Sequence, residues 1–291
     1  MDENSTVLDE KERTNEYLKT FRSLWRFTND FKKIKSTDSD AIEKLEKAIS
    51  KIPEIDILGS EIEKHKLSCQ EFINKIKIEK VKDFKKHETG YIKEMINQGK
   101  TVREYSGGWR INKFQLNTKP EFAKCRILYN GEVVIKWSNI NSKEDFIELE
   151  EKADSMLNDA IIPKEQLVEL FWEAYTQGIF RLNSTGDPKI LPIHDLYKEF
   201  RIALIRKHLE SKKITGKINK YLEFPLWNFL YNMDMYRLWG SEIPDNKKIV
   251  LQTGSMQETS KGKGFIVNGI NANEEYKVMC YAYAYKGGTE A

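Results

Sequence analysis

Cysteine and histidine are scarce in this chain, and neither residue type is spaced as a metal-ligand set. The three cysteines, Cys69, Cys125 and Cys280, lie far apart and are odd in number. We therefore expect reduced thiols in a cytoplasmic protein rather than a disulfide framework. The four histidines are also scattered, with no histidine or cysteine at zinc-site spacing. The expectation is that the protein holds no metal.

A long apolar run, a leader sequence and a large net charge are missing as well. No stretch approaches the ~18 apolar residues of a membrane span, and the acidic, polar N-terminus is unlike a signal peptide. The 48 basic and 45 acidic side chains leave a formal charge of +3. Binding of nucleic acid would therefore depend on local clusters of basic side chains and not on the total charge. We expect no membrane partner.

Motifs of catalysis and cofactor binding are lacking too. The glycine-containing segments 184–188 and 260–264 do not match a phosphate-binding loop. His194 and Asp195 are sequence neighbours and so point apart on a helix, where Asp195 is better explained as a first-turn anion. We expect no cofactor and a protein that is not an enzyme. An enzyme with a site assembled from dispersed residues is the least favoured of three hypotheses.

Aromatic side chains, in contrast, are abundant between residues 163 and 239. Aromatic residues bury more area than any others, so the main core is predicted here. Apolar spacing predicts helices at 163–178 and 194–211, and a last helix that begins at Pro225. Gly178 is expected to end the first of these helices.

Helical spacing also dominates the N-terminal third, where residues 9–98 are predicted to form three or four helices. Ile42, Leu45, Ile49 and Ile52 follow heptad spacing over two repeats. Longer repeats are typical of an extended coiled coil, so a packed bundle or a long hairpin is favoured.

Two regions carry β signals. Asn130-Gly131 between β-rich runs is typical of a type I′ hairpin, and Ser142 is expected to cap a helix that runs to about residue 158. The expected strands are 102–106, 109–117, 124–129 and 132–138, and then 248–252, 264–268 and 276–285 around a loop at 253–263. Residues 179–193 are expected to be irregular.

Together these patterns predict an α+β protein. Residues 1–100 form a helical N-terminal region, as a bundle or hairpin, and residues 101–291 form an α+β domain. That domain is expected to hold a small antiparallel sheet at 102–138, an aromatic-rich helical part at 142–239 and a β-rich C-terminal tail at 246–286.

The aromatic excess supports the leading hypothesis on function. One inward helix face cannot hold all these rings, so some are expected to face outward as interface anchors: Trp172, Tyr231, Tyr236 and Trp239. The alternative is a core of several helix layers that buries them. Outward rings favour a non-enzymatic subunit or adaptor that forms a homo-oligomer or joins a larger protein partner. The expected setting is a prokaryotic or phage complex that handles nucleic acid in defence or counter-defence.

Basic clusters support the second hypothesis, direct binding of DNA or RNA, because phosphate binding needs only clustered lysines and arginines. The candidate residues lie in the run 201–220 and in the tail loop: Arg206, Lys207, Lys212, Lys213, Lys217, Lys220, Lys261 and Lys263. A solvated basic surface without a partner is the alternative. Direct binding predicts a steep inverse dependence of affinity on salt.

Overall fold

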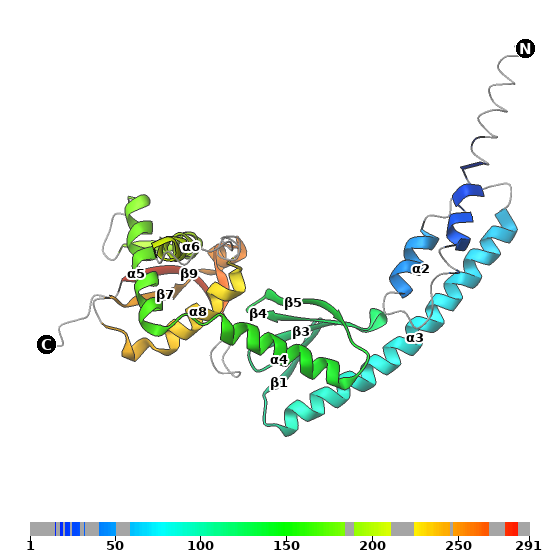
Figure 1. Ribbon diagram of the computed structural model, residues 1–291, viewed down its shortest axis with the longest axis horizontal. Helices are drawn as coiled ribbons and strands as arrows, with labels where there is room; N and C mark the ends of the chain where they lie inside the picture. The colour runs from blue at the N-terminus through cyan, green and yellow to red at the C-terminus, as the bar shows by residue number, and fades with distance from the viewer. Residues whose placement is uncertain are drawn as a thin grey trace, which may run out of the picture. The chain divides into compact units, whose positions relative to one another are not determined.

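A computed structural model describes residues 41–50, 59–183, 189–210, 224–244, 247–267 and 277–284, together with single positions between 15 and 32. The fold is α+β, as the sequence predicts, with two separate antiparallel sheets (Figure 1). No helix in the described ranges is both long and apolar enough to cross a bilayer.

Two compact units interleave in the sequence. One comprises Met1–Tyr91, Thr118–Cys125 and Ser138–Asp145, and the other comprises Ile92–Asn117, Arg126–Trp137 and Phe146–Ala291. The sequence-based division near residue 100 stays a prediction.

The described N-terminal helices are α2 (Ala41–Ile49) and α3 (Gly59–Asn97). A single helix therefore spans 59–97, where the sequence pattern suggested several. Ile42 and Ile49, two of the heptad positions, are buried in a core with Phe27, Ile73 and Ile76. The heptad pattern thus marks a packed core in this part of the chain.

The first sheet has the strand order β1-β2-β3-β4-β5. Its strands are β1 (Val102–Tyr105), β2 (Gly108–Ile111), β3 (Phe114–Lys119), β4 (Lys124–Tyr129) and β5 (Glu132–Asn139), with a 3-10 turn at Pro120–Phe122 between β3 and β4. The Asn130-Gly131 hairpin is confirmed, with φ values of 50° and 84° that a type I′ turn requires.

The expected single strand at 109–117 is wrong, because a tight turn divides it into β2 and β3. Asn112 adopts a φ of 48° at this turn, a conformation that asparagine tolerates better than most residues. Its side-chain Oδ1 accepts a hydrogen bond of 2.9 Å from the backbone N of Thr101, which holds the turn in place.

Helix α4 (Lys143–Asp159) begins at the predicted cap. The backbone N of Asp145 donates to Ser142 Oγ at 3.2 Å, and Asp145 Oδ2 accepts the backbone N of Ser142 at 3.1 Å. This reciprocal pair satisfies donors that the first turn leaves open. The body of α4 lies across one face of the first sheet (Figure 1).

The second sheet has the order β6-β9-β7, and β8 also pairs with β9. Its strands are β6 (Ile190–Pro192), β7 (Ile249–Thr253), β8 (Phe265–Val267) and β9 (Lys277–Ala284). The three expected tail strands are present. However, β6 lies in a stretch expected to be irregular, and the short helix α9 (Met256–Ser260) lies in the expected loop.

The aromatic core is confirmed. It lies among α5 (Lys164–Arg181), α6 (Ile193–Glu210) and α8 (Leu226–Leu238), with a 3-10 turn at Gly240–Glu242 after α8. Phe171, Phe200 and Phe229 are fully buried, and the Phe171 ring centroid lies 4.9 Å from that of Phe200 and 5.9 Å from that of Phe229.

Gly178 does not end its helix, which continues to Arg181. A Cβ at this position would lie 2.7 Å and 2.8 Å from the two terminal carbons of the Leu191 side chain. The glycine is therefore explained by the close approach of β6 to α5 and not by a cap.

Asn232 of α8 hydrogen-bonds to the connection between α4 and α5. It is fully buried, its Oδ1 accepts the backbone N of Ile162 at 2.8 Å, and its Nδ2 donates to the carbonyl of Ala160 at 2.9 Å. These backbone groups belong to a connection without regular structure, so they have no helical or sheet partner to replace the asparagine.

We predict that Asn232→Ala lowers the free energy of unfolding by about 2–4 kcal/mol, because it leaves two backbone groups without their partner. Equilibrium urea unfolding measures this change. Asn97→Ala, at the exposed end of α3, is the matched control and should change stability by less than about 0.5 kcal/mol. An Asn232→Ala protein as stable as this control would contradict the assignment.

Candidate nucleic-acid interface

The two faces of the first sheet differ in character. Successive side chains of a strand point to opposite faces. Ile111, Phe114 and Leu116 on β2 and β3 are almost completely buried, as are Ile127 and Tyr129 on β4. They share the face across which α4 lies, so the residues between them point to the opposite face.

On that opposite face, Arg103 of β1 stands directly opposite Arg110 of β2. Gln115 of β3 is the next residue in the same row. Directly opposed residues of an antiparallel pair have Cβ atoms about 4.5–5.5 Å apart. Two guanidinium side chains therefore project side by side from neighbouring strands.

Arg103 and Arg110 place two like charges directly opposite each other. Burial and the neighbouring charge of Arg103, in that order, hold the pKa of Arg110 below its ordinary value. The Nε and Nη2 atoms of Arg110 are buried and have no hydrogen-bond partner among the residues that the structure describes. Like charges directly opposite each other destabilise a sheet, and unsatisfied buried donors carry a desolvation cost. Neither feature helps the sheet to form.

The next row of the same face joins Tyr105, Gly108 and Asn117 across three strands. The Tyr105 hydroxyl donates to Asn117 Oδ1 over the intervening glycine. Gly108 has a φ of 153°, and a Cβ at this position would lie 1.8 Å from the carbonyl oxygen of Leu116. Only glycine fits at this position of β2, because any side chain would collide with the backbone of β3.

A third cationic side chain, Arg126 of β4, stacks with an aromatic ring. Its guanidinium carbon lies 4.8 Å from the ring centroid of Trp137 on β5, within the range of a cation–π contact. We call this surface the arginine face and define it by its polar and aromatic members, Arg103, Tyr105, Arg110, Gln115, Asn117, Arg126 and Trp137. On β1, β2 and β3, the positions that share this face hold no Asp or Glu.

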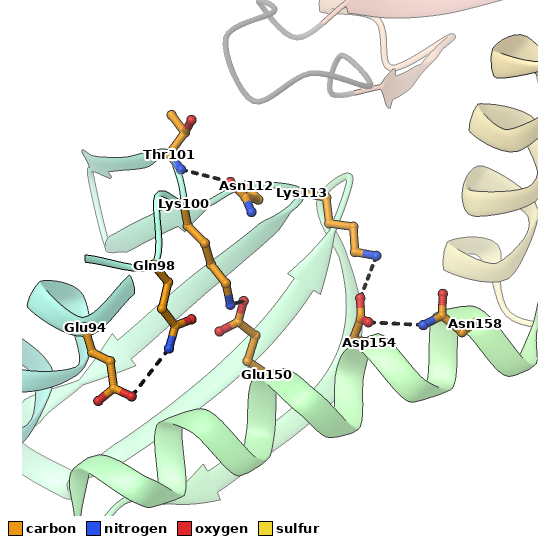
Figure 2. A network of polar contacts seen from close by, with 9 residues as sticks. All are labelled: Glu94, Gln98, Lys100, Thr101, Asn112, Lys113, Glu150, Asp154 and Asn158. Carbon is orange, nitrogen blue, oxygen red and sulfur yellow. Dashed lines mark hydrogen bonds and ion pairs between the residues drawn. The ribbon is translucent and has the colours of Figure 1, made fainter. Parts of the chain in front are cut away.

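A groove of about 880 Å³ lies on the other side, between the end of α3, the β2–β3 turn and α4. Figure 2 shows its polar network. Lys100 Nζ lies 2.9 Å from Glu150 Oε1, and Lys113 Nζ lies 2.6 Å from Asp154 Oδ1. Asn158 Nδ2 donates to Asp154 Oδ2 at 3.1 Å. Both lysines are neutralised by carboxylates of α4, so this network attaches the helix to the sheet.

Metal ligation is not indicated in the described ranges. There, no group of three or more histidine, cysteine, aspartate or glutamate side chains is arranged to hold a metal ion. Cys125 and Cys280 are buried free thiols, and burial raises the pKa of each above its ordinary value. Neither thiol is suited to act as a nucleophile at neutral pH.

The basic residues named from the sequence are not among the residues that define the arginine face. Lys212, Lys213, Lys217 and Lys220 fall outside the described residues. Arg206 and Lys207 belong to α6, and Arg206 Nη1 pairs with Glu173 Oε1 at 2.5 Å. Lys261 and Lys263 follow α9 and are exposed. Their role in binding stays a prediction.

The aromatic residues expected at a protein interface are divided. Tyr231 and Tyr236 are only 7% and 2% exposed, so the expectation that they face outward is wrong. Tyr231 packs edge-on against Tyr129 at 5.4 Å between ring centroids, and the Tyr236 hydroxyl accepts the backbone N of Ile249 at 2.7 Å. Strands cover both rings. Trp172 and Trp239 are half-exposed, and their interface role stays a prediction.

No family model, curated protein or solved structure matches this chain.

Near Lys261 and Lys263 in the sequence, the half-buried Glu258 carboxylate has an unusual environment. The Tyr281 hydroxyl donates to Glu258 Oε1, and the backbone N of Ser255 donates to Oε2 at 2.8 Å. These hydrogen bonds, that of Tyr281 first, lower the pKa of Glu258 to about 2. Because the folded pKa lies below the unfolded one, the contacts stabilise the fold above the unfolded pKa, and this stabilisation is lost as pH falls toward 2.

We predict that Tyr281→Phe raises the pKa of Glu258 toward its ordinary value, because the largest cause of the shift is removed. An NMR titration of the glutamate carboxyl carbons measures this. A Glu258 pKa that stays near 2 in the variant would contradict the assigned hydrogen bond.

Proposed function

We propose that this protein binds nucleic acid through the arginine face. The observation that carries the proposal is the opposed pair Arg103 and Arg110, in which Arg110 keeps two buried donors without a partner among the described residues. Two opposed guanidinium groups on neighbouring strands offer an anionic ligand two positive charges at one place on the sheet.

Phosphate is the anion that fits this pair best. A guanidinium presents its donors in a planar fork that matches two phosphate oxygens. Two such forks on adjacent strands can hold one phosphate between them or two consecutive phosphates of a chain. In either case the negative charge offsets the repulsion between the two arginines.

The aromatic and amide members of the face favour a nucleic acid over a simple anion. Tyr105, and Trp137 with Arg126 beside it, provide the aromatic and guanidinium surfaces on which bases stack. Gln115 and Asn117 lie on the strand next to Arg110, and side-chain amides can hydrogen-bond to base edges. An acidic protein segment would use the arginines but would not need the rings.

The subunit or adaptor role expected from the sequence stays a separate prediction. Binding of nucleic acid by the arginine face is compatible with membership of a larger complex.

We predict that the double variant Arg103→Gln/Arg110→Gln weakens nucleic-acid binding by roughly 10-fold or more, since each charge-assisted hydrogen bond contributes about 1.5–3 kcal/mol. The plot of log affinity against log salt should become shallower by about 0.7–0.9 for each phosphate that the variant no longer neutralises. Fluorescence anisotropy with a labelled oligonucleotide measures both. Thermal stability should be unchanged or raised, because the like-charge repulsion is removed.

Lys152→Gln is the matched control, since Lys152 is an exposed cation on α4, the helix that lies across the other face. It should leave affinity and salt slope unaltered. A variant in which Lys212, Lys213, Lys217 and Lys220 are all replaced tests the basic run 201–220 separately. If this variant loses binding and the arginine variant does not, the arginine face is not the interface.

A further inference from the structure

We infer that the arginine face selects single-stranded over duplex nucleic acid, with Tyr105 as a fixed platform on which one unpaired base stacks. This inference depends on the proposed function and adds the class of nucleic acid. It is based on the arrangement of three side chains: the Tyr105 ring lies along the sheet surface, one row away from the opposed pair Arg103 and Arg110.

The hydrogen bond of Tyr105 fixes the direction of its ring. Tyr105 and Asn117 stand in the same row on β1 and β3, with Gly108 of β2 between them. Neighbouring strands are about 4.8 Å apart, so the side chain must extend along the sheet surface to bring its hydroxyl to Asn117 Oδ1. A ring that projected away from the sheet could not make this hydrogen bond.

Gly108 makes room for that orientation. It has no side chain to separate the ring from the sheet, and its φ of 153° together with the 1.8 Å approach of a Cβ to Leu116 O excludes any other residue. Tyr105 is half-buried, so part of this residue remains accessible to a ligand.

Fixing the ring in advance favours binding. A side chain that is ordered before the ligand arrives loses less conformational entropy on binding. The bond to Asn117 holds the Tyr105 ring at both ends, by its backbone on β1 and by its hydroxyl on β3. A tyrosine placed only to cover the sheet would not need this second attachment.

The arginine pair lies at a suitable distance from the platform. Arg103 precedes Tyr105 by two residues on the same strand, which is about 6.6–6.8 Å along a β-strand. This separation is within the span of a single nucleotide. One nucleotide can thus stack its base on Tyr105 while Arg103 and Arg110 hold an adjoining phosphate.

Only an unpaired base can use such a platform. In a duplex the bases stack on one another, and the accessible surface consists of groove edges and phosphates. A single strand exposes base faces, which stack on aromatic side chains in proteins that bind single strands. Single-stranded DNA and RNA share this chemistry, and the experiment includes both.

The test is fluorescence anisotropy with one labelled oligonucleotide of mixed sequence, as single-stranded DNA, as single-stranded RNA and as a DNA duplex. The full-length protein should bind a single strand more tightly than the duplex. Tyr105→Leu should weaken single-strand binding by roughly 5- to 100-fold, the range found for loss of one stacked base. Duplex affinity and the salt slope should not change, since the arginines that bind phosphate are kept.

Tyr105→Phe keeps the ring and removes its bond to Asn117, so its affinity should lie between those of the wild type and Tyr105→Leu. This variant also covers the case in which Tyr105→Leu fails to fold. If single-stranded DNA and RNA bind with equal affinity, the protein recognises the base and the phosphate. If RNA binds more tightly, the protein also contacts the 2′-hydroxyl, and stacking on Tyr105 still holds.

The outcomes separate this inference from the proposed function. If Tyr105→Leu leaves single-strand binding intact, or if the duplex binds as tightly as the single strand, Tyr105 is not a stacking platform. In that case the proposed function still stands if Arg103→Gln/Arg110→Gln abolishes binding. A wild-type protein that binds none of the three oligonucleotides overturns both.

Discussion

The register of the first three strands is the constraint on which the arrangement of the first sheet depends. Ile111, Phe114 and Leu116 must be buried, and side chains alternate between the faces of a sheet, so Arg103, Arg110 and Tyr105 are forced to the opposite face. A shift of one residue would bury the arginines and expose the core. The hydrophobic pattern that makes the sheet fold therefore also builds the arginine face.

The remaining parts of the described chain support this sheet in different ways. Ion pairs at Lys100 and Lys113 attach α4 to it. The β4–β5 hairpin is tied to α8, because Tyr129 Oη and Asn130 Nδ2 donate to the buried Asp234 at 2.5 Å and 2.9 Å. These contacts hold the helix-covered side of the sheet rigid, and a rigid sheet keeps the arginines and Tyr105 in fixed positions.

Local signals in the sequence were sufficient for the fold class, the Asn130-Gly131 hairpin and the Ser142 cap. They failed where distant residues decide the outcome. Strand β6 exists because it pairs with β9, and Tyr231 and Tyr236 are covered by segments far away in sequence. The arginine face was not predicted, because a search for basic runs counts neighbours along the chain. Arg103 and Arg110 are separated by a hairpin, and only the register across Ser106 and Gly107, with Tyr105 opposite Gly108, brings them together.

The most direct measurement is ultraviolet crosslinking of the full-length protein to a single-stranded oligonucleotide, followed by mass spectrometric assignment of the crosslinked residues. The account predicts crosslinks to Tyr105 and to peptides from strands β1 to β3, and these crosslinks should disappear when Arg103 and Arg110 are replaced. Crosslinks confined to residues 201–220 or to the loop at 261–263, with none in the first sheet, would contradict it.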